Sequence, residues 1–256
     1  MTIPELIPLG FTTDDGYGAR ARIGLVVLET DQTIEAEFGT IDLPGVDVYH
    51  ARIANEPEVT PETLTAMRRD LPAAAGLLPS AFAFDAIGYG CTSAATLIGP
   101  DGVAACLHEA HPGVPASEPI SAAIAAMRAL GATRVAILTP YSAAVTAPIA
   151  EHFAAAGLEV AALGSFLETD DLVVARISPV SIAEGVRRLV GGADCDAVFV
   201  SCTSLRVLDI AAELESEIDI PVVSSNMALL WHLLRIAGVD DDLPGRGRLF
   251  AQPLAD

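Results

Sequence analysis

Short apolar runs alternate with longer segments of helical periodicity along most of the chain. Runs of this kind, bounded by polar or small residues, are typical of buried parallel strands. Strands that alternate with helices of about 10–15 residues predict an α/β fold with parallel sheets. The predicted strands are 22–28, 46–53, 85–90, 135–139, 158–163, 197–201 and 221–226, and the predicted helices are 31–38, 60–71, 92–98, 116–130, 143–156, 181–190, 205–217 and 227–237.

A nine-residue phrase occurs twice and indicates a duplicated half. Asp85-Ala-Ile-Gly-Tyr-Gly-Cys-Thr-Ser93 is followed 111 residues later by Asp196-Ala-Val-Phe-Val-Ser-Cys-Thr-Ser204. Segments 22–28 and 134–140 match at an offset of 112, as do 45–48 and 157–160. A repeat of this length indicates two homologous lobes rather than a solenoid, whose repeats are about 20–50 residues long.

The repeat predicts how the chain is divided. We predict a first lobe formed by residues 1–118 together with 222–256, and a second lobe formed by 119–221. The last predicted strand lies beyond the second repeat, so we expect the C-terminal segment to return and complete the first lobe. A ligand site is expected in the cleft between the lobes.

Composition excludes several kinds of chemistry and of partner. All 14 basic residues are arginine, and without lysine a pyridoxal-phosphate Schiff base, a class I aldolase and a P-loop are excluded. A net charge of −20 argues against nucleic acid and membrane surfaces as partners. We expect a cytoplasmic protein, because we find neither a signal peptide nor an apolar stretch of about 18 residues. The four cysteines lack metal-site spacing, so we predict free thiols and no metal.

Cys91 and Cys202 are the candidate catalytic residues. Each ends a predicted strand just before a predicted helix, and ligands bind at that edge of parallel sheets. The N–H groups and dipole of a helix N-terminus are expected to lower a thiol pKa and to bind a carboxylate. A single such cysteine is usually a small buried apolar residue, but two equivalent ones favour a pair that transfers protons on opposite faces of a substrate. The hydroxyls expected to assist are those of Thr92, Ser93, Thr203 and Ser204.

With these motifs the chain resembles the aspartate/glutamate racemase superfamily. The resemblance is greatest to its branch of maleate isomerases, arylmalonate decarboxylases and ectoine-utilization protein A. It rests on the two Cys-Thr-Ser phrases and on segments 139–141 and 224–226. It implies two flavodoxin-like lobes related by a pseudo-twofold axis, no cofactor, and a role for Tyr141 in holding a carboxylate. The intact Cys91 separates the chain from the decarboxylases, which lack the first cysteine.

Two departures from the maleate isomerase pattern concern the substrate. Asp31 and Asp171 stand where that family has asparagines that contact substrate carboxylates. Like charges in a closed site cost several kcal/mol, so a ligand with one carboxylate and an ammonium or amide group fits better than a free dicarboxylate. The phrase at 28–35 also resembles the ectoine-utilization variant.

We therefore predict a cofactor-independent racemase or epimerase of a small amino acid, such as a diaminobutyrate derivative from ectoine breakdown. Two alternatives stay open: a maleate-type cis–trans isomerase in which Cys91 forms a covalent adduct, and a non-catalytic small-molecule binder. The expected partners are a small carboxylate or amino-acid substrate and further copies of the chain, in a dimer or tetramer.

Overall fold

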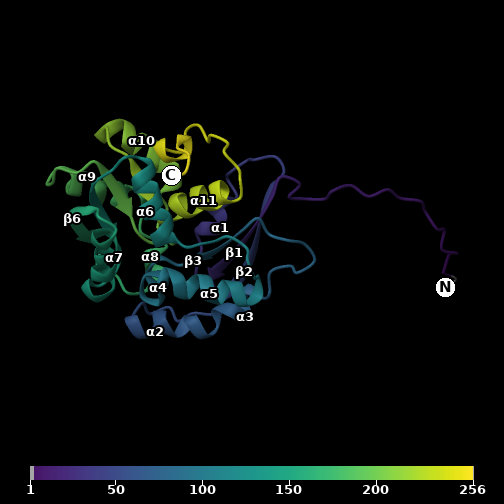
Figure 1. The fold of residues 1–256 in the computed structure, drawn as a ribbon. Coiled ribbons are helices and arrows are strands. Elements are labelled where there is room, and N and C mark those ends of the chain that lie inside the picture. Colours follow the sequence, from purple (N-terminus) through teal and green to yellow (C-terminus); the bar gives the residue numbers. More distant parts are fainter. Residues whose placement is uncertain (1–2, 256) are drawn as a thin grey trace.

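The fold consists of two halves with the same order of elements. It was obtained as a computed structural model, which describes residues 3–255 (Figure 1). The first half contains β1 (Ala21–Leu28), α1 (Ile34–Phe38), β2 (Val46–Ile53), α2 (Pro61–Ala66), α3 (Leu71–Ala75), β3 (Ala86–Gly90), α4 (Thr92–Ile98), α5 (Pro100–Ala110), β4 (Ala116–Ser117) and α6 (Pro119–Ala129). The second contains β5 (Arg134–Thr139), α7 (Ala143–Ala155), β6 (Glu159–Ser165), α8 (Asp171–Val174), α9 (Pro179–Val190), β7 (Ala197–Val200), α10 (Leu208–Ile218), β8 (Val222–Ser224) and α11 (Ser225–Ile236).

Each half builds one four-stranded parallel sheet. The strand orders are β2-β1-β3-β4 and β6-β5-β7-β8, so equivalent strands occupy equivalent places. All pairs of neighbouring strands in both sheets are parallel. The predicted α/β fold with two similar lobes is therefore confirmed.

The final strand corrects one prediction about the lobes. We expected residues 221–226 to complete the first lobe, but β8 pairs with β7 in the second sheet. Its counterpart is β4, a two-residue strand that pairs with β3 and that the apolar pattern did not predict because it is so short. The predicted lobe boundary at 118/119 stays a prediction. The predicted boundary at 221/222 would separate β8 from the second sheet, to which it belongs.

Two helices connect the halves. α11 follows β8 but packs on β3 and β4 of the first sheet, while α6 follows β4 and contacts β8 and α7 of the second half. The two helices also pack against each other, and the Ser117 hydroxyl lies 2.7 Å from Nδ1 of His232. This exchange of helices holds the carboxyl edges of the two sheets in a fixed relation.

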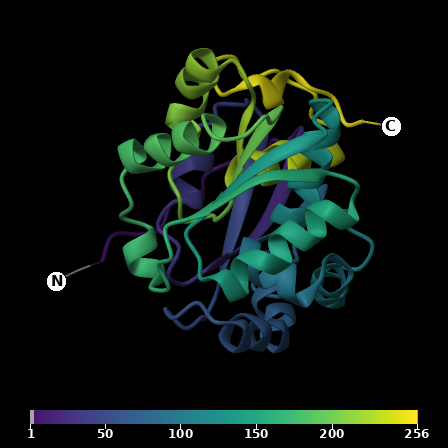
Figure 2. The ribbon, with the colours of Figure 1, turned by 90° about the vertical axis from the view of Figure 1, so that its left-hand side faces the viewer.

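Buried strands and covering helices explain where the core lies. Every residue of β3 and β7 is buried, as expected for central parallel strands covered on both faces. Figure 1 shows α1 and α11 on one side of the first sheet and α3 and α5 on the other. In the second lobe, α9 contacts β5 and β6 and α7 contacts β6 (Figure 2).

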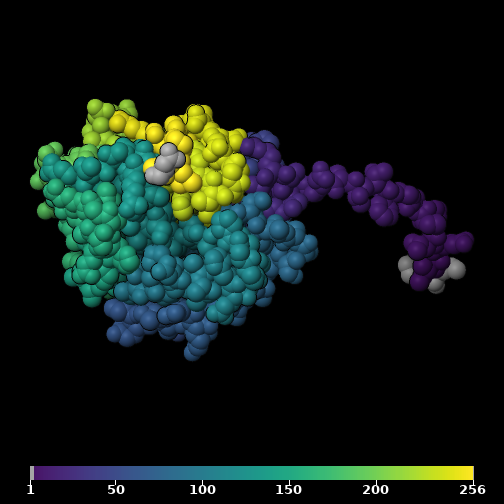
Figure 3. Space-filling view, viewed as in Figure 1, coloured from purple at the N-terminus to yellow at the C-terminus, as the bar shows by residue number. Residues whose placement is uncertain are grey.

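The segment before β1 runs away from the body of the protein (Figure 3). Its apolar side chains are exposed, with Ile3 91% and Phe11 88% accessible. Within the part of the chain that the structure describes, no helix has both the length and the apolar character that a bilayer crossing requires.

Candidate active site

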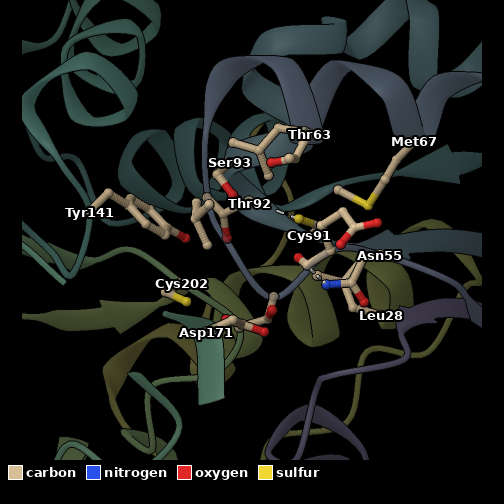
Figure 4. A pocket seen from close by; sticks show the side chains of 14 residues that line it. Leu28, Asn55, Thr63, Met67, Cys91, Thr92, Ser93, Tyr141, Asp171 and Cys202 are labelled. Atoms are coloured by element: carbon tan, nitrogen blue, oxygen red, sulfur yellow. Dashed lines mark hydrogen bonds between the residues drawn. The ribbon is translucent and has the colours of Figure 1, made fainter. Parts of the chain in front are cut away.

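A small cavity lies where the carboxyl edges of the two sheets meet (Figure 4). Its volume is about 20 Å³, which is room for about one water molecule, so the cavity is narrow. The first half contributes Cys91, Thr92 and Ser93, which follow β3. The second half contributes Tyr141, Asp171, Cys202 and Thr203. The repeat therefore brings its two cysteines to one cavity.

Cys91 occupies the position predicted from the sequence. It has extended backbone angles, φ −147° and ψ 111°, and is the N-cap residue of α4. Its sulfur lies 3.8 Å from the Ser93 hydroxyl.

Cys202 differs from this pattern. We expected a helix directly after it, but residues 203–207 form a turn and α10 begins only at Leu208. Its φ of 133° is rare for a residue with a side chain and stores backbone strain of about 1–3 kcal/mol. The Cys202 N–H donates to the Ser225 hydroxyl at 3.0 Å, and the Ser204 N–H donates to the Cys202 sulfur at 3.4 Å.

The thiol pKa values overturn a second expectation. We expected helix N-termini to lower them, but burial raises the pKa of Cys91 to about 11 and raises that of Cys202 still further. Each cysteine is only 3% exposed, so loss of hydration outweighs the N–H donors. The negative charge of Asp171 acts in the same direction on both. Burial therefore favours the protonated form of both thiols.

Tyr141 lines the cavity, and Figure 4 shows its hydroxyl pointing into it. Burial raises its pKa. Tyr141 and Ser93 both present hydroxyls to the cavity, and the Ser93 hydroxyl lies 3.8 Å from the Cys91 sulfur.

Two predicted substrate-binding residues lie behind the lining. Asp31 is 3% exposed and does not line the cavity; its Oδ1 accepts from the N–H groups of Thr33 and Ile34, both at 2.8 Å. Its Oδ2 is buried without a hydrogen-bond partner. Ser204 also lies behind the lining, where its hydroxyl donates to Asp171 Oδ1 at 3.1 Å. That either residue contacts substrate stays a prediction.

The sequence analysis missed the residues that cover the cavity. Asn55, Glu56 and Val59 from the loop after β2, and Thr63 and Met67 from α2 and the turn after it, complete the lining. The loop is fixed to the second half, because the Val59 N–H donates to Thr169 O at 2.9 Å and the Asp171 N–H donates to Pro57 O at 3.0 Å. No local motif marks these residues, since only the packing of the two halves places them over the cysteines.

Two buried polar networks support the Cys202 turn. The Ser225 hydroxyl accepts from the Cys202 N–H and from the Thr92 hydroxyl, the latter at 2.7 Å, and so connects both cysteine turns. Glu37 accepts from the N–H groups of Val207 and Leu208 at the start of α10. Asn226 donates to Glu37 at 2.7 Å and to the Thr203 carbonyl at 2.8 Å. The sequence marks Cys202, Thr92, Thr203 and segment 224–226, but it gives no signal for Glu37.

Comparisons with known proteins agree with this arrangement. The family model described as arylmalonate decarboxylase matches residues 101–250. The chain is 34% identical to the arylmalonate decarboxylase of Bordetella bronchiseptica over 140 residues, which is 54% of this chain and 58% of that protein. It is 26% identical to a maleate isomerase of Geobacillus stearothermophilus over 245 residues, 90% of this chain and 97% of that protein.

Solved structures give the same result. The maleate isomerase Iso of Pseudomonas putida S16 superimposes with a TM-score of 0.82 at 25% identity, covering 90% of this chain and 98% of that one. A mutant maleate cis–trans isomerase of Nocardia farcinica with a covalently bound succinylcysteine intermediate superimposes with a TM-score of 0.81, at 25% identity and the same coverage.

The chain belongs to the arylmalonate decarboxylase family. Within it, similarity over nearly the whole length extends to maleate isomerases, and the chain is an enzyme of the isomerase type.

Proposed function

We propose that the protein catalyses cis–trans isomerisation of a small unsaturated carboxylate through a covalent adduct on Cys91. The observation that carries the proposal is that Cys91 and Cys202, the equivalent cysteines of the two halves, line one cavity. The similarity to a maleate cis–trans isomerase that holds a succinylcysteine intermediate supports the same chemistry. This was the alternative to the racemase prediction, and the similarities favour it.

The proposed reaction begins with addition to the double bond. The Cys91 sulfur bonds to one alkene carbon, and Cys202 gives its proton to the neighbouring carbon. The proton released by Cys91 replaces the one lost by Cys202, and the hydroxyls of Ser93 and Tyr141, which line the cavity, offer a route between them. The carbon–carbon bond is now single and rotates. Reversal of the same steps breaks the carbon–sulfur bond and releases the trans isomer.

Isomerisation and racemisation both need a thiolate at one cysteine, and burial raises the pKa of both thiols. What favours isomerisation is the similarity to maleate isomerases over nearly the whole chain. Racemisation of an amino acid remains the second candidate, because the same two thiols facing one cavity also suit proton transfer on opposite faces.

Proton NMR tests the proposal. We expect the wild-type protein to convert at least one of maleate, its monoamide and cis-4-aminobut-2-enoate into the trans isomer, and we expect Cys91→Ser and Cys202→Ser to lose this activity. Persistence of all three cis compounds would contradict the proposal. Exchange of the α-proton of N-acetyl-diaminobutyrate in D₂O, without any isomerisation, would instead support the racemase.

Three narrower predictions accompany this proposal. Assignment to the ectoine-utilization branch rests on the phrase at 28–35 and predicts a role in ectoine breakdown. We also propose assembly into a homo-oligomer and a cytoplasmic location. Light scattering and cell fractionation test the last two directly.

A further inference from the structure

The cavity has charged side chains of one sign only. Asp171 and Glu56 line it, whereas no arginine or histidine does so among residues 3–255. A substrate carboxylate therefore depends on neutral donors. Ser93 and Tyr141 present hydroxyls to the cavity, and Figure 4 shows Ser93 and Asp171 on opposite sides of it. The site thus has a donor side and an acceptor side.

Asp171 is held firmly as an acceptor. It is 4% exposed and begins α8, and its carboxylate oxygens accept from the Thr30 hydroxyl at 2.5 Å and the Ser204 hydroxyl at 3.1 Å. These hydroxyls belong to different halves of the chain, so the carboxylate is fixed between them. Each carboxylate oxygen can accept a further hydrogen bond, which leaves room for a donor from the substrate.

Asp31 adds negative charge behind the residues that line the cavity, on the side of Asp171. Its Oδ2 is buried without a hydrogen-bond partner. Burial is the main cause of its raised pKa, and the charge of Asp171 adds to it. A second anionic group on the substrate would face Asp171 with Asp31 behind it, and among residues 3–255 no arginine or histidine lines the cavity to compensate. Like charges placed together in a closed site are strongly unfavourable.

We propose that the substrate has a carboxylate at one end of its double bond and a hydrogen-bond donor, a carboxamide or an ammonium group, at the other, and that Asp171 binds this donor. The inference rests on the proposed isomerase function and names its substrate class. Asp171 is then a specificity-determining residue that selects against free dicarboxylates. The donor end lies against Asp171, and the carboxylate end lies against Ser93 and Tyr141.

Binding measurements separate this inference from the catalytic proposal. Calorimetry on Cys91→Ser, which cannot form the adduct, compares maleate, its monoamide maleamate and cis-4-aminobut-2-enoate. We expect at least one of the two donor-bearing compounds to bind about tenfold or more tightly than maleate. The stronger of the two identifies the donor as amide or ammonium.

The substitution Asp171→Asn in the same background should reverse the preference, since the amide removes the charge and can donate to a carboxylate. Asp170→Asn is the matched control: Asp170 is exposed, caps α8 through Leu172 and Val173, and asparagine also serves as an N-cap. We expect this control to retain the wild-type preference. Melting temperatures show whether each variant folds. If Asp171→Asn does not fold, the binding preference measured with Asp171 intact still decides the question.

The outcomes distinguish the two proposals. Equal or tighter binding of maleate would overturn the substrate class, even if maleate is isomerised. A tenfold preference for a donor-bearing compound that is bound but never isomerised would support the substrate class and overturn the isomerase function.

Discussion

The two Cys-Thr-Ser turns have the same sequence but different local structures. Cys91 is extended and directly precedes α4, whereas Cys202 has a φ of 133° and is followed by a turn. Burial raises the pKa of both thiols, that of Cys202 more than that of Cys91, and the charge of Asp171 adds to both shifts. The proposed mechanism accordingly assigns Cys91 as the nucleophile and Cys202 as the acid. On this proposal, duplication supplied two equivalent thiols, and their different surroundings separate their roles.

The largest expected effect comes from removing either thiol. Cys202→Ser should lower kcat by about 10²–10⁴-fold, the usual contribution of a general acid. Cys91→Ser should abolish turnover and every covalent adduct, because serine is a far weaker nucleophile. Steady-state kinetics with a cis substrate measures both. Equal residual activity and adduct formation in the two variants would contradict the division of roles.

The buried acid Asp31 of the first half is expected to make the stability of the protein depend on pH. Burial raises the pKa of Asp31 from 3.8 to about 6, so the folded protein binds this proton more tightly than the unfolded chain does. Stability should therefore fall as pH rises through this window, by about 3 kcal/mol from this group alone. In Asp31→Asn this loss should disappear, while the amide oxygen can still accept from Thr33 and Ile34. Urea unfolding at pH 4, 5, 6 and 7 measures it, and parallel pH profiles for the two proteins would contradict the expectation.

Ser225 tests whether the strained turn matters for catalysis. Ser225→Ala leaves the buried Cys202 N–H without its acceptor, which costs about 1–3 kcal/mol of stability and should lower kcat about tenfold with a smaller effect on KM. Ser224→Ala is the control. It removes the N-cap of α11, which costs about 1 kcal/mol of stability, but it leaves the hydrogen bond from the Cys202 N–H to Ser225 intact. Similar kcat values for the two variants would show that Ser225 is only structural.

The smallest expected effect is a shift in thiol reactivity. Asp171→Asn removes a charge that raises the pKa of both cysteines, so the pH at which iodoacetamide begins to alkylate Cys91 should decrease. Peptide mapping across pH 8–11 separates this thiol from Cys106 and Cys195. An unchanged profile would mean that burial alone holds the Cys91 proton.

Features repeated along the chain were predictable, and features created by packing were not. The apolar pattern predicted seven of the eight strands, missing only the two-residue β4, and the duplicated phrase predicted the meeting of Cys91 with Cys202. The sequence could not show that Cys202 adopts a positive φ, because its Cys-Thr-Ser phrase is the same as that of Cys91. The Cys202 conformation depends on Ser225, which follows β8.

The pKa shifts of Cys91 and Cys202 were predicted in the wrong direction because burial, like the Cys202 turn, is created by packing. A helix N-terminus is visible in a sequence, whereas the closing of Asn55, Val59 and Met67 over the thiols appears only when the two halves are assembled. The final strand was misplaced because its helix, α11, does pack on the first lobe while the strand itself pairs with β7.

The central claim is that one sulfur forms a bond to the substrate while the other moves a proton. Its most direct test is peptide mapping by mass spectrometry of Cys202→Ser after incubation with maleamate and acid quenching. We predict a saturated thioether adduct on Cys91 and none on Cys106 or Cys195. An unmodified Cys91 under conditions in which the wild-type protein isomerises the same compound would contradict the account.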